Sequence, residues 1–299
     1  MGEMIALLSA VLFGAGNTLI RKGSVSSSSR SGAFVSVLLT FAISGLGFVV
    51  AGLFRGWPAF SFEGTLWFML SGLLIAFLGR LLLYLTIQYI GSVRSSAIKP
   101  LNPFFAVFAG FVLLGERITQ SLWSGMALIF AGFVILVVQS LRIARNLHTD
   151  PARSSLTGYA YGVLAAVVYG LGMVFRKMGL VEMPDPYLGT MISAAVGIAV
   201  YLAMALFNGG YRQAVIHSFT RFDLWMFMAG TAISVGQTMH FAALQYIEVS
   251  RAAMILSLET IFTLFFSAWI FRTRENITPG TVIAAILSMA GAGIIASFR

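Results

Sequence analysis

Hydrophobic residues along the chain are gathered into long uninterrupted runs, and most charged residues lie between them. Each run is roughly 17 to 22 residues long, close to the ~20 residues that a helix needs to cross about 30 Å of hydrocarbon. A β-barrel would instead need segments of about ten residues in which apolar and polar residues alternate. Because the runs are continuously apolar, they predict membrane-spanning helices.

We predict ten such helices, which makes the expected fold class an all-α membrane protein. The approximate spans are 4–20, 34–53, 65–87, 95–114, 122–140, 157–179, 187–207, 224–245, 251–271 and 279–296. The first run continues straight into Arg21 and Lys22, without a basic segment before it or a small-residue cleavage site after it. It is therefore interpreted as the first span and not as a cleavable signal peptide.

The chain contains an internal repeat. QYIGSVRSSAIKPLNPFF at 88–105 returns as QYIEVSRAAMILSLETIF at 245–262, and LLSAVLFGAG at 7–16 corresponds to VLAAVVYGLG at 163–172. Five spans in each repeat is an odd number, so the second repeat enters the membrane from the opposite side. Such inverted repeats are typical of secondary transporters, which bind substrate near the midplane between the halves. Duplication kept only for structural symmetry is the alternative.

The predicted organisation follows from this repeat. The first five-helix repeat covers residues 1–140, a polar linker covers 141–156, and the inverted second repeat covers 157–299.

Composition supports the membrane assignment and excludes several functions. The 299 residues are 59% hydrophobic and 10% charged, with a mean hydropathy of +0.92, which is more apolar surface than one soluble core hides. The chain has no cysteine and its three histidines are scattered, so we expect no metal and no cofactor. The net charge of +9 lies at span ends, where lipid headgroups explain it, so no nucleic acid is expected. Motifs typical of enzymes, such as HExxH, GxSxG and the P-loop, do not occur in the sequence, so we expect no enzyme.

Charged side chains inside the runs are the main functional signal. An arginine at the centre of a helix costs about 2.5 to 3.5 kcal/mol to insert, so each one indicates a partner or a cavity. Arg80 lies midway along the third span with no acidic residue within a helical turn. It is predicted either to contact substrate or a counter-ion, or to be a structural arginine bound to helix carbonyls. Tyr84 lies four residues later and hence on the same face.

A second group of polar residues lies in the two copies of the repeated segment. Lys99 and Asn102 are three residues apart near the start of the fourth span, where two prolines are expected to bend the helix. Glu259 takes the repeat position of Asn102, on a ninth span that is expected to be unkinked. We expect its carboxyl to be neutral, to pair with Lys99 or Arg80, to carry a proton, or to have a structural role. Lys99 alternatively snorkels to the membrane surface.

The eighth and first spans complete the candidate site. His240 follows Gln237, the repeat mate of Arg80, by three residues, and a histidine suits proton coupling although packed histidines are commoner. Phe13 and Tyr169 are repeat mates that offer aromatic walls, although packing is the commoner role. The predicted substrate-binding residues are Arg80, Lys99, Asn102, Tyr84, Asn17, Gln237, His240 and Glu259.

Short motifs at corresponding places in the two repeats carry a family resemblance. They are Leu101-Asn-Pro-Phe104 followed by Gly115-Glu116-Arg117, and Leu258-Glu259-Thr260 followed by Glu275, with glycines in the fifth and tenth spans. On these motifs the chain resembles the EamA-type carriers of the drug/metabolite transporter superfamily, over essentially its whole length. It departs from them in Leu-Glu-Thr, where these carriers often have Leu-Glu-Pro, and in lacking a glycine before Glu275. The resemblance implies ten helices around a cavity lined mainly by spans 1, 3, 4, 6, 8 and 9, alternating access, and no use of ATP.

The charges of the predicted lining favour one ligand class. The predicted lining holds two cations, Arg80 and Lys99, and one acid, Glu259, so its net charge is positive. A positive charge attracts a carboxylate or phosphate and repels an organic cation where screening is weak. We therefore expect a secondary transporter for a small polar metabolite, with export of amino acids or related carboxylate-bearing metabolites as the first hypothesis. A carrier of phosphorylated metabolites and a flippase for a lipid-linked headgroup are the alternatives. Its expected partners are the substrate and membrane lipid, and it is expected to be a monomer or weak dimer.

Charge in the loops and the family resemblance disagree about orientation. The odd-numbered loops hold eleven Lys and Arg residues, and the even-numbered loops with the C-terminus hold six. By the positive-inside rule, the termini would lie outside. The resemblance implies that both lie inside, and we keep that expectation for a multi-pass protein of a bacterial inner (cell) membrane.

Overall fold

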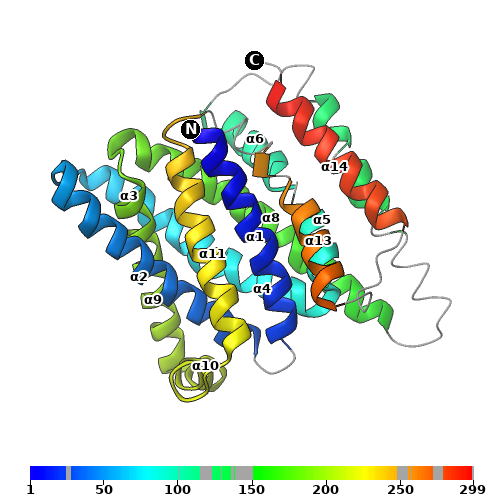
Figure 1. Ribbon diagram of the computed structural model, residues 1–299, viewed down its shortest axis with the longest axis horizontal. Coiled ribbons are helices and arrows are strands. Elements are labelled where there is room, and N and C mark those ends of the chain that lie inside the picture. Colours follow the sequence, from blue (N-terminus) through cyan, green and yellow to red (C-terminus); the bar gives the residue numbers. More distant parts are fainter. Residues whose placement is uncertain are drawn as a thin grey trace.

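The protein is helical throughout the residues that the structure, a computed structural model, describes (Figure 1). These residues are 1–24, 28–99, 101–114, 123–128, 130–135, 138, 151–247, 255–256, 258–271 and 279–297. No strand occurs among them, which confirms the all-α expectation, and each of the ten predicted spans overlaps helical residues.

Within the ranges just given, five helical stretches are long and apolar enough to cross a membrane. They correspond to α1 (Gly2–Gly23), α2 (Ser29–Arg55), the continuous series α3 (Phe62–Ser71), η1 (Gly72–Gly79) and α4 (Arg80–Ile90), α8 (Pro151–Glu182), and α9 (Pro186–Phe207). The described residues also form α5 (Ser92–Ile98), α6 (Leu101–Leu114), α10 (Gly209–Thr220), α11 (Leu224–Ala243), α13 (Glu259–Phe271) and α14 (Pro279–Ser297), and residues 123–128 and 130–135 are helical as well. Of the predicted linker, 151–156 lie in α8 and 141–150 lie outside the described residues.

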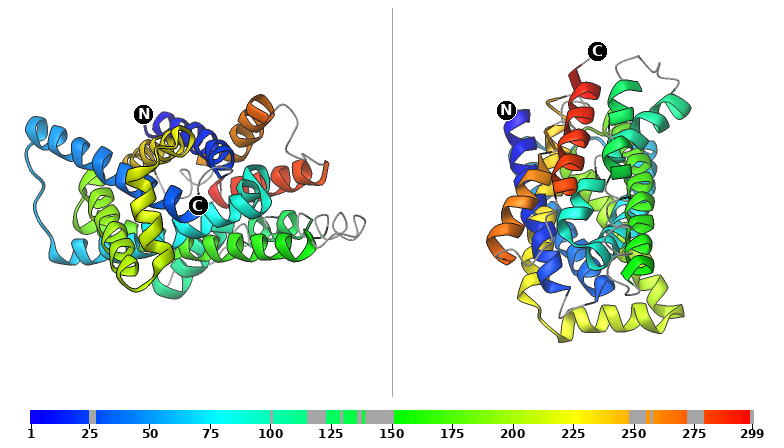
Figure 2. Two further views of the ribbon diagram at one scale, coloured as in Figure 1. Left: turned by 90° about the horizontal axis from the view of Figure 1, so that it is seen from below. Right: turned by 90° about the vertical axis from the view of Figure 1, so that its right-hand side faces the viewer.

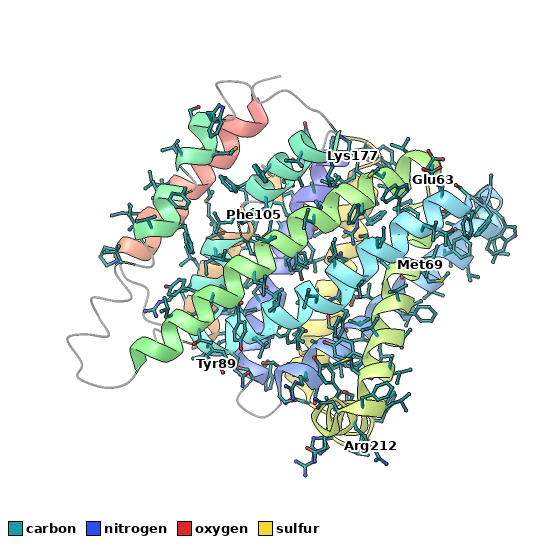
Figure 3. All side chains as sticks on the ribbon, turned by 180° about the vertical axis from the view of Figure 1, so that it is seen from behind. Glu63, Met69, Tyr89, Phe105, Lys177 and Arg212 are labelled. Atoms are coloured by element: carbon teal, nitrogen blue, oxygen red, sulfur yellow. The ribbon has the colours of Figure 1, made fainter. Side chains whose placement is uncertain are left out.

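The outer surface carries many large apolar side chains, as a surface facing lipid does. Leu46, Met69 and Phe265 are among those that are well exposed. Figure 3 shows Met69 on the outside of the bundle, between Glu63 near one end and Arg212 near the other. This arrangement of an apolar middle between charged ends is the one that a bilayer requires.

One helix was not predicted. The stretch between the seventh and eighth spans forms α10, which lies across the end of the bundle, roughly perpendicular to the long helices (Figure 2). Asn208 precedes it, and the Asn208 side chain accepts a hydrogen bond from the backbone N–H of Gly210 at 2.9 Å. The segment is short and mixes charged with apolar residues, so it lacks the continuous apolar run by which the spans were recognised.

The two repeats pack in equivalent ways. In the first repeat α1 lies against α11 and α13, and its counterpart α8 lies against the third span and α6. A Cβ on Gly14 of α1 would lie 2.6 Å from the Cβ of Phe262, and one on Gly170 of α8 would lie 2.8 Å from the Cβ of Phe105. These distances are too short for any side chain, so a glycine is needed at both contacts. Phe105 and Phe262 are themselves repeat mates.

The third span departs from its repeat mate by one residue. Gly72 and Gly79 are seven residues apart, whereas their counterparts Gly230 and Gly236 are six apart. Residues 72–79 form the π-helix η1, and the backbone N–H of Arg80 reaches back five residues to the carbonyl of Ile75. The counterpart in α11 is regular α-helix. A π-helical turn accommodates the extra residue without ending the helix, and such turns are frequent at functional sites.

The helix α1 begins and α14 ends at the same end of the bundle (Figure 1). An even number of crossings produces this arrangement.

Candidate functional site

A small internal cavity lies between the two repeats. Water-sized molecules have about 80 Å³ of space in it. The residues that line it are Phe13, Ile75, Leu83, Lys99, Asn102, Tyr169, Met173, Arg176, Ile233, Gln237, His240, Leu256, Glu259 and Thr260. We call this space the central cavity. The surface of its walls is mainly apolar, and seven of the fourteen lining residues, together with the Tyr169 hydroxyl, contribute polar or charged groups to it.

The lining is arranged in repeat-related pairs. Phe13 of α1 corresponds to Tyr169 of α8, and by the alignment of 88–105 with 245–262 Lys99 corresponds to Leu256 and Asn102 to Glu259. The cavity therefore lies on the pseudo-two-fold axis of the repeats, where the inverted-repeat architecture positions a substrate.

One side of the cavity holds an ion pair. Lys99 Nζ lies 2.5 Å from Glu259 Oε1 and donates to Asn17 Oδ1 at 3.2 Å. Asn17 Nδ2 donates to the same Glu259 oxygen at 2.5 Å. The ammonium also lies 5.6 Å from the centroid of the Phe13 ring, within the range of a cation–π interaction. Of the roles expected for Glu259, the structure has the pairing with Lys99.

Both copies of the repeated segment have an interrupted helix at this ion pair. In the first repeat α5 ends at Ile98 and α6 begins at Leu101, so Lys99 lies at the break. In the second repeat Leu258 lies in a turn and α13 begins at Glu259. The expectation of an unkinked ninth span is therefore wrong, although its residues 251–254 and 257 lie outside the described part. The helix dipole favours an acidic residue at the first position of a helix. This explains why α13 begins at Glu259 although this copy of the segment has no proline there.

The other polar part of the cavity is built around Arg176 of α8. This side chain is 2% exposed and its guanidinium carbon lies 4.1 Å from the centroid of the Phe241 ring. With the Gln237 amide oriented so that its oxygen faces α8, Arg176 Nη2 and Nη1 donate to that oxygen at 2.7 and 3.0 Å. Arg176 Nε and both ring nitrogens of His240 have no hydrogen-bond partner among the described residues.

The charges of the lining do not cancel. Lys99 and Arg176 are its cations and Glu259 is its acid, among the residues described. Since Lys99 is paired with Glu259, the hydrogen-bond acceptor that the described residues offer to the guanidinium of Arg176 is the neutral amide of Gln237. A buried charge with so little compensation is expensive, and an anionic ligand would stabilise it.

Two of the predicted residues lie away from the cavity lining. Arg80 is buried against α2, where its Nη1 donates to Ser36 Oγ at 3.0 Å and to Thr40 Oγ1 at 2.7 Å. These partners are hydroxyls, not the helix carbonyls expected for a structural arginine. Tyr84 is also fully buried. Of the other six candidates, Lys99, Asn102, Gln237, His240 and Glu259 line the cavity, and Asn17 contacts its ion pair.

Sequence reasoning missed Arg176. It was counted with Lys177 among the loop charges, because adjacent basic residues at the end of an apolar run indicate a span end. The apolar residues Met178 to Val181 that follow were the available signal, since they carry α8 on to Glu182. Without Arg176 the even-numbered loops and the C-terminus together hold five basic residues.

The fold and the cavity together define an integral multi-pass membrane protein built from two repeats around a buried polar site. Comparison with known proteins gives its family. The EamA-like transporter family matches residues 1–138 and again residues 156–297, so the chain belongs to that family.

Individual relatives are more distant. A "probable amino-acid metabolite efflux pump" of Escherichia coli is 24% identical over 228 residues, which cover 74% of this chain and 73% of that protein. A "probable transport protein" of Saccharomyces cerevisiae is 22% identical over 239 residues, which cover 74% of this chain and 65% of the yeast protein. One solved crystal structure covers 97% of this chain and 99% of its own, with a TM-score of 0.53 and 18% identity, and so shares the fold.

Proposed function

We propose that this protein is a secondary transporter that carries a small carboxylate-bearing metabolite by alternating access, and that it exports amino acids or related compounds. The observation that carries the proposal is the guanidinium of Arg176 in the central cavity, with no acidic partner among the described residues. A guanidinium has a planar fork of donors that fits a carboxylate with two parallel hydrogen bonds.

The surroundings of Arg176 support the same ligand class. The side chains of Gln237 and His240 lie in the same lining, and the ring nitrogens of His240, which have no partner within the described part of the chain, can bond a ligand. The first turn of α6, with Asn102, also borders the cavity, and the N-terminus of an interrupted helix favours an anion. The printed name of the Escherichia coli relative, an amino-acid metabolite efflux pump, is in keeping with this proposal.

The size of the cavity requires a conformational change on binding. A space of about 80 Å³ is smaller than the ~300 to 1,000 Å³ of common ligand pockets. Equivalent packing of α1 and α8 against the opposite repeat gives the protein two matching contacts that can rearrange in turn, as alternating access requires.

The decisive experiment compares ligands with and without a carboxylate. L-Leucine is the first probe, because much of the lining is aliphatic. The purified protein is titrated with L-leucine, with 4-methylpentanoate, which lacks the amino group, and with 3-methylbutylamine, which lacks the carboxylate, and its melting temperature is followed. We expect stabilisation by the two carboxylates, exchange of labelled leucine in proteoliposomes, and loss of both with Arg176→Gln. A protein that the amine stabilises as well as the carboxylates, or that keeps its carboxylate preference in Arg176→Gln, contradicts the proposal.

We also propose that both termini lie in the cytoplasm of a bacterial cell. The common end of α1 and α14 in the bundle supports a shared side, and the family resemblance supports the inner side. A fluorescent protein fused after Arg299 is expected to fluoresce, and alkaline phosphatase fused at the same place to be inactive. The reverse pattern would place the termini outside, as the loop charges suggest.

A further inference from the structure

The ion pair at the cavity has the chemistry of a binding site for an ammonium group. The Lys99 ammonium is held by the Glu259 carboxylate, by the side-chain oxygen of Asn17 and, at 5.6 Å, by the face of the Phe13 ring. A carboxylate, an amide oxygen and an aromatic face are the groups that recognise a protonated amine in any ligand. Lysine supplies that amine here from within the chain.

The acceptors of this site are held in place by packing. Asn17 is one helical turn after Gly14, and Glu259 is one turn before Phe262 and Thr263. Gly14 lies against those two residues, with a Cβ added there only 2.6 Å from Phe262 Cβ and 2.9 Å from the Thr263 backbone nitrogen. This close contact between α1 and α13 fixes the distance between the amide and the carboxylate. Asn17 Nδ2 also donates a hydrogen bond to Glu259 Oε1, so the two acceptors are joined to each other as well as to Lys99.

The ammonium donor, in contrast, is attached to interrupted backbone. Lys99 lies between α5 and α6, and its side chain is 19% exposed, against 7% for Glu259. Its four-carbon stem can turn away from the acceptors while the two helices that carry them stay packed. Lys99 also borders a second space, of about 10 Å³, whose lining includes Ser95, Asn102 and Tyr169.

We propose that Asn17, Glu259 and Phe13 form a subsite for the ammonium group of the transported molecule, and that Lys99 fills this subsite when that molecule is absent. The inference rests on the proposed function for the identity of the ligand, since Arg176 would hold its carboxylate. A ligand bearing both groups then replaces Lys99 at Glu259, and the departure of the lysine enlarges the cavity. When the carrier is empty, the ammonium of Lys99 pairs with the Glu259 carboxylate again, so the buried negative charge is never left without a positive partner.

The test restores the missing ammonium from solution. Lys99→Ala removes the side chain beyond Cβ, which is three carbons and the ammonium, and n-propylammonium reproduces what was removed. We expect Lys99→Ala to melt below the wild-type protein, and n-propylammonium to raise its melting temperature saturably by about 3 °C or more. The neutral analogue n-propanol at equal concentration should have no such effect. The wild-type protein should not respond to n-propylammonium, because the tethered ammonium of Lys99 occupies the subsite at a high effective concentration.

Two control variants separate the subsite from other effects of the amine. Lys99→Ala/Glu259→Gln should lose the response, since the carboxylate is gone. Leu256→Ala shortens the repeat mate of Lys99 in the same lining and leaves the ion pair in place, so its melting temperature should not respond to the amine. A response that n-propanol equals, that survives Glu259→Gln, or that the wild-type protein shares overturns the proposal. If Lys99→Ala does not fold, Lys99→Met with methylammonium replaces it in the same comparison.

The amine titration and the transport experiment fail independently. Loss of leucine exchange with the amine response intact removes the proposed substrate but keeps the ammonium subsite. Leucine exchange with no amine response keeps the transporter and assigns Lys99 and Glu259 a purely structural ion pair.

Discussion

Where α1 of the first repeat meets α13, Gly14 lies against Phe262; where α8 of the second repeat meets α6, Gly170 lies against Phe105. The next glycines along the two helices repeat the comparison, since Gly16 lies against Ile233 and Gly172 against Ile75. The helices α1 and α8 thus each contact the opposite repeat through glycines at equivalent positions. A mutation that disturbs one copy has a matched counterpart in the other.

The central cavity differs between the repeats at these same helices. Lys99 of the first repeat corresponds to Leu256 of the second, Asn102 to Glu259, and Leu83 to His240. Arg176 has an apolar counterpart, Ile20. The helix contacts are therefore still symmetric, as matched movements of the two repeats require. The side chains of the lining are not symmetric, which suits a ligand whose two ends differ. Four experiments test this contrast, from the largest expected effect to the smallest.

The ion pair between the repeats should produce the largest change in stability. Lys99→Met and Glu259→Gln are each expected to lower the free energy of unfolding by about 3 kcal/mol, because each leaves a buried group without its partner. The double variant should lose less than the sum of the two, by about 1 kcal/mol or more. Unfolding in mixed micelles gives the four values of the cycle. Leu256→Met, at the repeat mate of Lys99, is the matched control and should change little, and additive losses would show that the pair is not coupled.

Two buried arginines should differ in what their loss affects. Arg176→Gln removes charged hydrogen bonds to a ligand, worth about 1.5 to 3 kcal/mol, and should weaken leucine binding at least about tenfold. Arg80→Gln should change the same affinity by less than about threefold, since Arg80 bonds to Ser36 and Thr40 of α2 and does not line the cavity. Thermal-shift titrations with leucine measure both affinities. Equal losses of affinity in the two variants would mean that Arg80 contacts the ligand, as its position in the sequence suggested.

The glycine contacts should show equal, intermediate effects. Gly14→Ala and Gly170→Ala are each expected to lower stability by about 1 to 3 kcal/mol, because the added Cβ overlaps backbone atoms as well as a side chain. Gly209→Ala is the control, since a Cβ there meets no atom within 4 Å. Melting temperatures of the three variants are compared. If only one of the two repeat mates is sensitive, the repeats do not pack equivalently.

The fold was more predictable from sequence than the site, for physical reasons. Long apolar runs determine where helices cross the membrane, whatever their neighbours are. The π-helical turn before Arg80 depends on one extra residue relative to the second repeat, which becomes visible only when Gly72 and Gly79 are matched to their counterparts. That turn rotates the rest of the span, and rotation decides which face meets the cavity. The burial of Arg176 beside Lys177 likewise depends on which of two adjacent side chains faces inward.

The smallest and most diagnostic change is at His240, whose repeat mate is Leu83. Both ring nitrogens of His240 are buried without a partner among the described residues, so the imidazole is a net cost to folding unless a ligand bonds to it. His240→Leu, which copies the first repeat, is therefore expected to raise stability by about 1 kcal/mol and to weaken leucine binding severalfold. The reverse change, Leu83→His, places an imidazole at the matching position without Arg176 beside it and should lower stability. A His240→Leu protein that is less stable would mean that the imidazole has a partner in the protein, and one with unchanged leucine affinity would restrict ligand recognition to Arg176 and the ion pair.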